Sequence, residues 1–384
     1  MRIALLAHAL RSQGGLLRGH GFISALIRSA PQHEYLITVP AGCGYEDISL
    51  PANSRFHFCE NKDINKAFFS RIAIEFSEVP SVLRSFKADV VFGMCNHGYR
   101  NINCPQVIWI SNGYLVYPQK HFPTATLGER LRARLQRLNL GRVLKRADLL
   151  FCQTPVMRRH ISDYYGYEME KIHILPNALP VFLRKVDKEG AVTRPRDVAK
   201  DKFNCLILTK YYPHKNPEMV LDACLESEER FDEIRFITTI SEGDNVHSRA
   251  FIRRLDANPQ LKGLIQNIGP IAYEKLESYY RNVQLVVMPT LMESFSVTYL
   301  EAMYFGVPIL TTDLDFAHYI CGDAAVYYDP WRPESLVEKL VMLKSDSEVR
   351  RKMVEAGYKQ LKKFSFTWDD IVKTAVGQLE RLMA

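Results

Sequence analysis

Short apolar segments alternate with segments of helical periodicity along nearly the whole chain. Apolar runs rich in β-branched and aromatic residues predict buried strands, and apolar residues spaced three and four apart between them predict helices. In the first half the strand-like runs are RIALLAH, EYLITVP, DVVFGM, QVIWIS and DLLFCQT. This alternation predicts a parallel sheet with helices on both faces.

The alternation is interrupted once and then restarts. Residues 184–203 contain eleven charged residues among twenty and show no apolar period, which is typical of a linker. The strand-like runs that follow are NCLILT, IRFITTI, LIQNIG, VQLVVMPT, PILTT and AAVYYD. We therefore expect an α/β protein with two Rossmann-like, doubly wound domains facing each other across a cleft. The expected division is a first domain at 1–178, a charged linker at 179–203, a second domain at 204–365, and a helix at 366–384 that returns to the first domain.

The composition is that of a globular protein. Hydrophobic residues make up 47% of the 384 residues and charged residues 24%, and no apolar run reaches the roughly 20 residues of a membrane-spanning helix. The opening MRIALLAHAL has no small-residue cleavage site and leads into polar residues, so we expect a cytoplasmic protein. The eight cysteines form no CxxC pair and are expected to be reduced and mostly buried. Cys95, His97 and Cys104 have no second cluster of ligands beside them, so no metal site is predicted.

Positive charge is concentrated in the first half. Residues 1–178 hold 22 basic and 13 acidic residues, whereas the remainder holds 28 and 30. The segment 127–147 alone has seven basic residues and one acidic residue. Two interpretations of this predicted helix remain open: its leucine face lies on an anionic membrane, or that face packs on the sheet with the arginines merely solvated. The face consists of Leu127, Leu131, Leu135 and Leu138, flanked by Arg130, Arg134 and Arg137. Nucleic acid is not an expected partner, because no recognisable binding motif is present.

Two glutamates stand in an apolar stretch, LMESFSVTYLEAMYFGVPI at residues 291–309. Glu293 lies in the loop that leaves a predicted strand, and Glu301 lies on the next helix, which Gly306 should end. The first backbone N–H groups of that helix favour an anion such as a diphosphate. Carboxylates accept hydrogen bonds from vicinal hydroxyls, so a diphosphate between two sugars, a nucleotide-sugar, would match the whole stretch. The alternative is that both glutamates are solvated surface residues.

Residues elsewhere in the chain could complete such a site. Lys210 and Lys215 follow the first strand of the second domain, and an ammonium group is a suitable partner for phosphate oxygens. Gly14 and Gly15 come directly after the first strand of the first domain, where the lack of a side chain lets a ligand approach the backbone closely.

The stretch ESFSVTYLE resembles the Glu-x7-Glu motif of the retaining family-4 glycosyltransferases, which have the GT-B fold. The segments PTLMESFSVTYLEAMYFGVPILTTD, NIGPIAYEKLESYYRNVQLVVMPT and LTKYYPHKN also resemble that family, most strongly within residues 205–330. The resemblance implies that Glu301 holds the donor ribose, that Glu293 holds the hexose and that the lysines neutralise the diphosphate of a UDP- or GDP-sugar. It also implies retention of anomeric configuration. The implied donor-binding residues are Gly14, Gly15, Lys210, Lys215, Glu293, Ser294, Phe295, Ser296, Val297 and Glu301, with Glu293, Lys215 and Lys210 as the catalytic set.

The sequence departs from the family in two places. Arginine is usual where Lys210 stands, so the charge is kept but the forked hydrogen bonding is lost. The family often has a histidine after the strand corresponding to QVIWIS, where this chain has Ser111 and Asn112. These two residues and His8, which ends the first strand, are the candidates for the acceptor side.

The expected activity is transfer of a hexose to a lipid-linked or polysaccharide acceptor in cell-surface glycan synthesis. No Asp-x-Asp metal triplet is present, so lysines and helix N–H groups are expected to stabilise the leaving diphosphate without a metal or other cofactor. Two alternatives remain: a nucleotide-sugar epimerase on the same fold, and a non-catalytic nucleotide-binding protein associated with a membrane.

Overall fold

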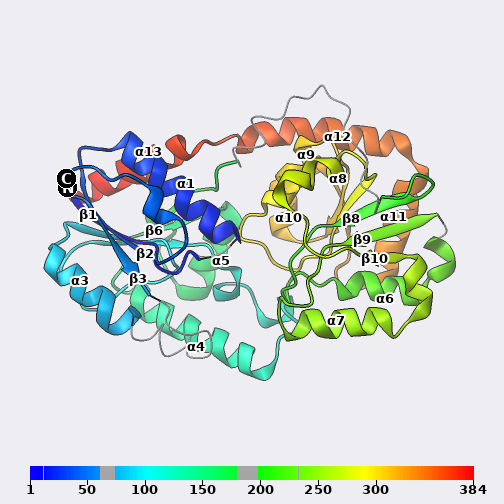
Figure 1. Ribbon diagram of the computed structural model, residues 1–384, viewed down its shortest axis with the longest axis horizontal. Helices are drawn as coiled ribbons and strands as arrows, with labels where there is room; N and C mark the ends of the chain where they lie inside the picture. Colours follow the sequence, from blue (N-terminus) through cyan, green and yellow to red (C-terminus); the bar gives the residue numbers. More distant parts are fainter. Residues whose placement is uncertain (12, 61–73, 180–197, 232) are drawn as a thin grey trace. The chain divides into compact units, whose positions relative to one another are not determined.

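The structure is a computed structural model that describes residues 1–11, 13–60, 74–179, 198–231 and 233–384 (Figure 1). Most of the predicted linker therefore lies outside the described residues. The chain divides into two compact units. Unit 1 comprises residues 1–116, 131–178 and 366–384, and unit 2 comprises residues 117–130 and 179–365.

Unit 1 is built on a parallel sheet that, within the described residues, has the strand order β3-β2-β1-β4-β5-β6-β7. The order reverses beside β1, which pairs with β2 on one side and with β4 on the other; Ile3 is in register with both Tyr35 and Val90. The strands are β1 (Arg2–Leu6), β2 (Glu34–Pro40), β3 (Arg55–Cys59), β4 (Val90–Gly93), β5 (Gln106–Ile110), β6 (Leu149–Cys152) and β7 (Ile172–Ile174).

Both faces of this sheet are covered. Ile3 and Leu5 of β1 belong to a buried cluster with residues of α1 and α13, whereas Ala4 and Leu6 belong to a second cluster with residues of α3. This follows from the two-residue period of a strand, which sends successive side chains to opposite faces. The α-helices are α1 (Gln13–Ser29), α3 (Val79–Phe86), α4 (Leu127–Leu144), α5 (Pro155–Tyr165) and α13 (Trp368–Met383).

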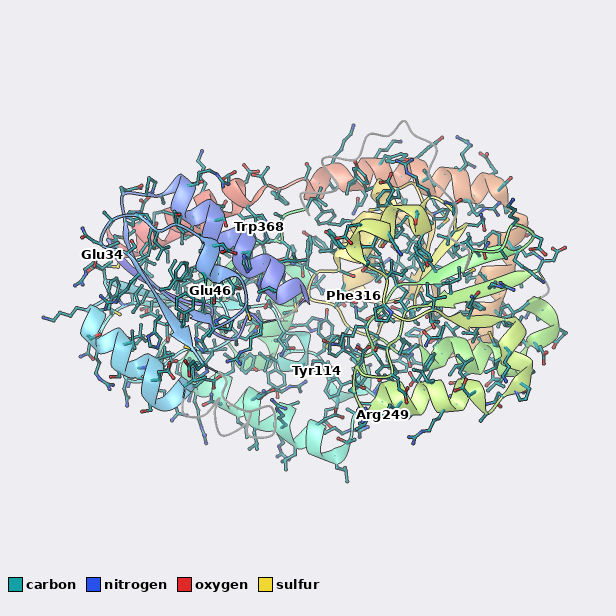
Figure 2. The ribbon with its side chains drawn as sticks, in the orientation of Figure 1. Glu34, Glu46, Tyr114, Arg249, Phe316 and Trp368 are labelled. Atoms are coloured by element: carbon teal, nitrogen blue, oxygen red, sulfur yellow. The ribbon has the colours of Figure 1, made fainter. Side chains whose placement is uncertain are left out.

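The C-terminal helix α13 packs beside α1, at the opposite end of the sequence (Figures 1 and 2). Asp369 accepts hydrogen bonds from Arg28 Nη2 at 2.7 Å and from Ser29 Oγ at 2.9 Å. A Cβ atom at Gly21 would lie 2.1 Å from Nε1 of Trp368. Only glycine therefore lets the two helices approach this closely.

Unit 2 contains a second parallel sheet, in which the described strands have the order β10-β9-β8-β11-β12-β13. The strands are β8 (Phe203–Ile207), β9 (Ile234–Thr238), β10 (Ile265–Asn267), β11 (Leu285–Met288), β12 (Ile309–Thr312) and β13 (Ala325–Tyr328). The α-helices are α6 (Glu218–Glu226), α7 (Val246–Asp256), α8 (Leu276–Tyr280), α9 (Val297–Tyr304), α10 (Asp315–Cys321), α11 (Pro333–Ser345) and α12 (Ser347–Leu361). The predicted fold class, two doubly wound α/β domains, is confirmed.

Residues 117–130 differ from the sequence-based division. They were expected in the first domain, but the structure groups them with unit 2. The reason is a set of contacts to the loop after β11: His121 Nδ1 donates to the Leu291 carbonyl at 2.5 Å, and the Tyr117 hydroxyl donates to the Glu293 carbonyl at 3.5 Å. The first residues of α4 are therefore assigned to unit 2 and the rest of that helix to unit 1. None of the described helices combines the length and apolar character needed to cross a bilayer.

Candidate functional site

The predicted donor residues of unit 2 lie where the strand order reverses. Strand β8 pairs with β9 on one side and with β11 on the other. Lys210 and Lys215 follow β8, and Glu293 follows β11. In an open parallel sheet the crevice outside the carboxyl ends of such strands is the usual ligand site.

Lys215 and Glu293 form an ion pair. Lys215 Nζ lies 2.5 Å from Glu293 Oε1, and the two side chains are 21% and 10% exposed. The loops that carry them are joined by a backbone hydrogen bond of 2.7 Å from Leu291 N to the His214 carbonyl. Burial, together with the charge of Lys215, lowers the pKa of His214 well below its usual range. His214 is therefore neutral at pH 7 and adds no charge beside the pair.

Lys210 has a partner that the sequence analysis missed. Its Nζ lies 3.6 Å from Asp244 Oδ1, and the Asp244 side chain is only 11% exposed. The other carboxylate oxygen of Asp244 accepts a hydrogen bond from Tyr211 N at 3.2 Å. Asp244 lies beyond the carboxyl end of β9, the strand beside β8, so its position after the run IRFITTI was a usable signal.

The stretch after Glu293 leads directly into α9. Phe295 is buried and packs against Phe364 with 5.9 Å between ring centroids. Ser296 is the N-cap residue of α9, and its side chain makes no capping hydrogen bond. Gly306, with φ of 67°, follows the end of the helix as predicted. The N-terminal N–H groups of α9 are thus not capped by the serine and can serve an anion.

Glu301 is buried on α9, with 6% of its surface exposed. The Tyr280 hydroxyl of α8 donates to Glu301 Oε2 at 2.8 Å, and no hydrogen bond to Oε1 is found within the described residues. Burial raises the pKa of Glu301 above its usual range. Burial and the charge of Glu301 also raise the pKa of Tyr273. The alternative in which both glutamates are solvated is therefore wrong, since both side chains are largely buried.

The predicted glycines occupy a different local structure from the one expected. Gly14 and Gly15 lie in the first turn of α1, not in a turn directly after β1. The apolar periodicity of the helix starts only after them, so this earlier start could not be predicted from the pattern. No described atom lies within 4 Å of a Cβ built at Gly14, and the nearest to one at Gly15 is 3.8 Å away. A Cβ atom at either position would therefore meet no close contact among the described residues.

The acceptor-side candidates lie in unit 1. His8 is buried, with Nδ1 3.1 Å from Thr38 Oγ1 of β2. The backbone N–H groups of Ser111 and Asn112 both donate to Asn96 Oδ1, at 2.5 and 3.0 Å. The structure therefore brings these two residues together with Asn96 at the carboxyl end of β5.

The exposed face of α4 settles one of the alternatives left open by the sequence. The exposed fractions of its four leucines are 85%, 58%, 57% and 52%, in the order Leu127, Leu131, Leu135 and Leu138. The interpretation in which these leucines pack on the sheet is therefore wrong. The opposite face is the buried one and includes Arg137, whose Nε donates to the Tyr114 carbonyl at 2.8 Å. Arg137 is therefore a structural residue and not a solvated flank of the leucine face.

The cysteines and the metal-ligating residue types give no donor-site metal cluster within the described residues. All eight cysteines are free, and most are buried. Among the described residues, three side chains of metal-ligating types lie close together in unit 1, namely His57, Cys59 and Glu78. His57 Nε2 lies 2.8 Å from Glu78 Oε1. No predicted donor-binding residue belongs to this group.

Solved structures of glycosyltransferases have the same fold, with two Rossmann-like domains. Sucrose-phosphate synthase from Thermosynechococcus elongatus matches with a TM-score of 0.73 at 14% identity, over 100% of this chain and 99% of that one. The Anabaena protein Alr3699/HepE, solved in complex with UDP-glucose, matches with a TM-score of 0.67 at 14% identity, over 99% and 100%. Similarity at this level of identity shows the shared fold.

The amino-acid sequence is also similar to glycosyltransferases over part of its length. Residues 193–360 match the family model of the glycosyl transferases group 1. A D-inositol 3-phosphate glycosyltransferase of Segniliparus rotundus is 22% identical over 311 residues, which cover 75% of this chain and 69% of that protein. Over the matched segment, which is less than half of its length, the chain is similar to the group 1 glycosyltransferases.

Proposed function

We propose that this protein transfers a hexose from a nucleotide-diphosphate sugar to a glycan or lipid-linked acceptor, with retention of anomeric configuration. The observation that carries the proposal is the placement of the Lys215–Glu293 pair, the uncapped N-terminus of α9 and the buried Glu301 along one strand–loop–helix segment. That segment follows β11, at the point where the strand order of unit 2 reverses.

The donor would be bound in parts. The N-terminal N–H groups of α9 and the ammonium groups of Lys210 and Lys215 are the groups suited to the diphosphate. Glu301 Oε1 would accept hydrogen bonds from the ribose hydroxyls, and Glu293 from those of the hexose. The complex of Alr3699/HepE with UDP-glucose supports a nucleotide-sugar as the class of donor.

The proposed reaction needs stabilisation of a leaving diphosphate. Lysines and oriented N–H groups could supply it, because positive groups held at the leaving oxygen stabilise the negative charge that develops there. The acceptor hydroxyl would attack the anomeric carbon and pass its proton to the departing phosphate oxygen. We propose that no metal ion takes part.

The acceptor would be presented at a membrane surface. The exposed leucines of α4 share their helix with exposed basic residues, namely Arg132, Arg134, Arg142, Lys145 and Arg146 within or just beyond it. Apolar side chains flanked by cations are suited to the boundary of an anionic bilayer, where each cation contributes about 1 kcal/mol. This supports a peripheral protein on the cytoplasmic side that acts in cell-surface glycan synthesis.

The decisive experiment is a screen of UDP- and GDP-sugars by thermal shift, followed by transfer assays with excess EDTA. A ligand at about 100 times its Kd should stabilise the protein by about 2.7 kcal/mol. We expect one nucleotide-sugar to shift the Tm and its sugar to be transferred in EDTA with the anomer retained, as read by NMR of the product. A donor that is isomerised without an acceptor, or activity that disappears in EDTA and returns with Mg²⁺ or Mn²⁺, would contradict the proposal.

A further inference from the structure

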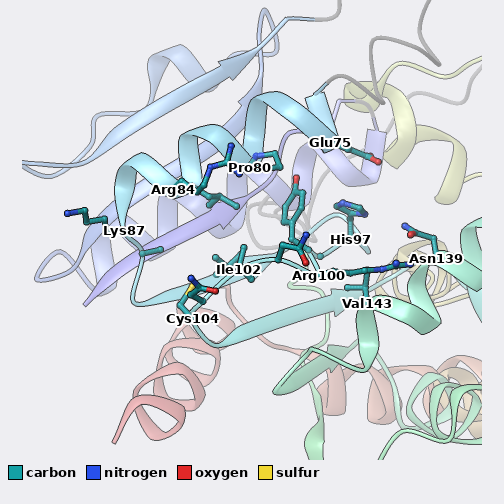
Figure 3. Close-up of a pocket in the computed structure, with 17 residues that line it drawn as sticks. Glu75, Pro80, Arg84, Lys87, His97, Arg100, Ile102, Cys104, Asn139 and Val143 are labelled. Carbon is teal, nitrogen blue, oxygen red and sulfur yellow. The ribbon is translucent and has the colours of Figure 1, made fainter.

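Unit 1 contains a cavity of about 690 Å³ on the α3 side of its sheet (Figure 3). It is enclosed by α3, by the segment that joins β4 to β5, and by the inner face of α4. This volume is in the range of small-molecule sites. Much of the wall is apolar, and its aliphatic members are Pro80, Leu83, Ala88, Val91, Ile102 and Val143. An apolar group of ligand size can therefore be accommodated.

The cavity also has a strongly positive rim. Arg84 of α3 and Lys87, the C-cap residue of that helix, line it on one side, and Arg100 of the β4–β5 segment contributes a third cation. All three are exposed, and no ion pair involving them occurs within the described part of the chain. Among the described residues that line the cavity, Glu75 is the one carboxylate. The imbalance favours an anionic ligand over a neutral or cationic one.

One buried hydroxyl at the cavity wall has no hydrogen-bond partner among the described residues. Tyr99 is 8% exposed, and within the described residues its hydroxyl makes no hydrogen bond. Its backbone is held in place because Tyr99 N donates to Gln106 Oε1 at 2.6 Å and Gln106 Nε2 donates to the Tyr99 carbonyl at 3.2 Å. Buried polar groups are nearly always satisfied, so this hydroxyl points to a ligand that brings an acceptor atom.

We infer that this cavity binds a phosphate monoester carrying an apolar chain. The phosphate would be held by Arg84, Lys87 and Arg100, and the chain would lie along the apolar wall. Guanidinium groups bind phosphate oxygens bidentately, which makes two arginines a fitting pair for a phosphate dianion. The source of such a ligand would be a lipid bilayer, because the helix whose Asn139 and Val143 line the cavity carries the exposed leucine face on its other side. The inference concerns binding alone and does not depend on sugar transfer.

The test is titration calorimetry of the full chain with octyl phosphate, octanol and inorganic phosphate. We expect octyl phosphate to bind at least about tenfold more tightly than either of the other two, because only it uses both parts of the cavity. The Arg84→Gln/Arg100→Gln variant should lose roughly tenfold or more of that affinity. The matched control Arg142→Gln, which removes an exposed cation outside the cavity lining, should bind as the parent does.

A second variant tests the binding of the ligand's apolar chain. Ile102→Trp places a large ring at a half-buried position of the cavity wall. It should weaken the binding of octyl phosphate and leave the affinity for inorganic phosphate unchanged. Stabilisation by the nucleotide-sugar, measured on the same variants, should be unaffected, so a failure of this inference and a failure of the proposed donor site are distinguishable. Equal binding of octyl phosphate and inorganic phosphate would show a site for free phosphate and overturn the inference. Equal binding of octyl phosphate to the parent and the double variant would overturn it as well.

Discussion

The replacement Glu301→Gln separates the proposed binding role of Glu301 from its contribution to folding. The carboxylate is buried, and its pKa is raised because burial penalises the charged form. At neutral pH the ionised group therefore lowers the stability of the folded state, and this penalty disappears as the pH falls below the raised pKa. A neutral glutamine keeps the shape and can still accept the hydrogen bond from Tyr280 without the cost of burying a charge.

The two expected effects have opposite signs. Without ligand, the variant should be at least as stable as the parent at pH 7.5, and the difference should shrink as the pH is lowered toward the ordinary pKa of a glutamate. A gain of 1 kcal/mol would raise Tm by about 2–4 °C for a domain of this size. Binding should become weaker, because a hydrogen bond to a charged acceptor contributes about 1.5–3 kcal/mol. That loss corresponds to a Kd roughly ten- to hundredfold higher for the nucleoside diphosphate.

The assay is a thermal melt at several pH values combined with isothermal titration by UDP and GDP. Glu338→Gln is the matched control, because Glu338 is exposed on α11 of the same unit; it should change neither Tm nor affinity. If the Glu301 variant melted at a lower temperature than the parent yet bound the diphosphate with unchanged affinity, the carboxylate would be a structural residue, and its assignment to the ribose would be refuted.

The remaining predictions concern the ion pair and the surface of α4. Lys215→Ala should weaken the binding of a nucleoside diphosphate far more than the binding of a nucleoside. Equal losses of affinity in calorimetry would show that Lys215 does not bind the diphosphate. Glu293→Gln should leave diphosphate affinity nearly intact and slow transfer roughly ten- to hundredfold; an unchanged rate would exclude a role at the hexose. Leu131→Ser/Leu135→Ser should reduce sedimentation with anionic phospholipid vesicles about tenfold or more, whereas Leu17→Ser, at a 59% exposed leucine of α1, should not; equal sedimentation of all three proteins would rule out docking through α4.

Much of the donor site could be predicted from local pattern. The run QLVVMPT contains β11 (Leu285–Met288), and the helix after it spans Val297–Tyr304 before Gly306. Strand and helix ends follow from short-range periodicity and turn chemistry. The position of Glu293 in the loop and of Glu301 on the helix was therefore evident without a structure.

Contacts between distant segments could not be predicted. Asp244 approaches Lys210 because β9 and β8 are neighbours in the sheet. The burial of Glu301 depends on α8, whose Tyr280 reaches it from a separate element. Spacing along the sequence does not show which strands or helices become neighbours, because the order of the strands in the sheet decides that.

The sequence by itself determined the doubly wound class, the element boundaries around the donor segment and the identity of its charged groups, because each depends on residues close together in the chain. The tertiary structure decided which of those groups are buried or paired, which unit residues 117–130 join, and which face of α4 meets solvent. The leucines of α4 follow the same period whether they face a sheet or water, and only the packing of the opposite face, with Ala133 and Leu140 inward, distinguishes the two. The periodicity of the sequence shows which residues share one face of a helix, whereas the neighbouring elements determine which face is buried in the core.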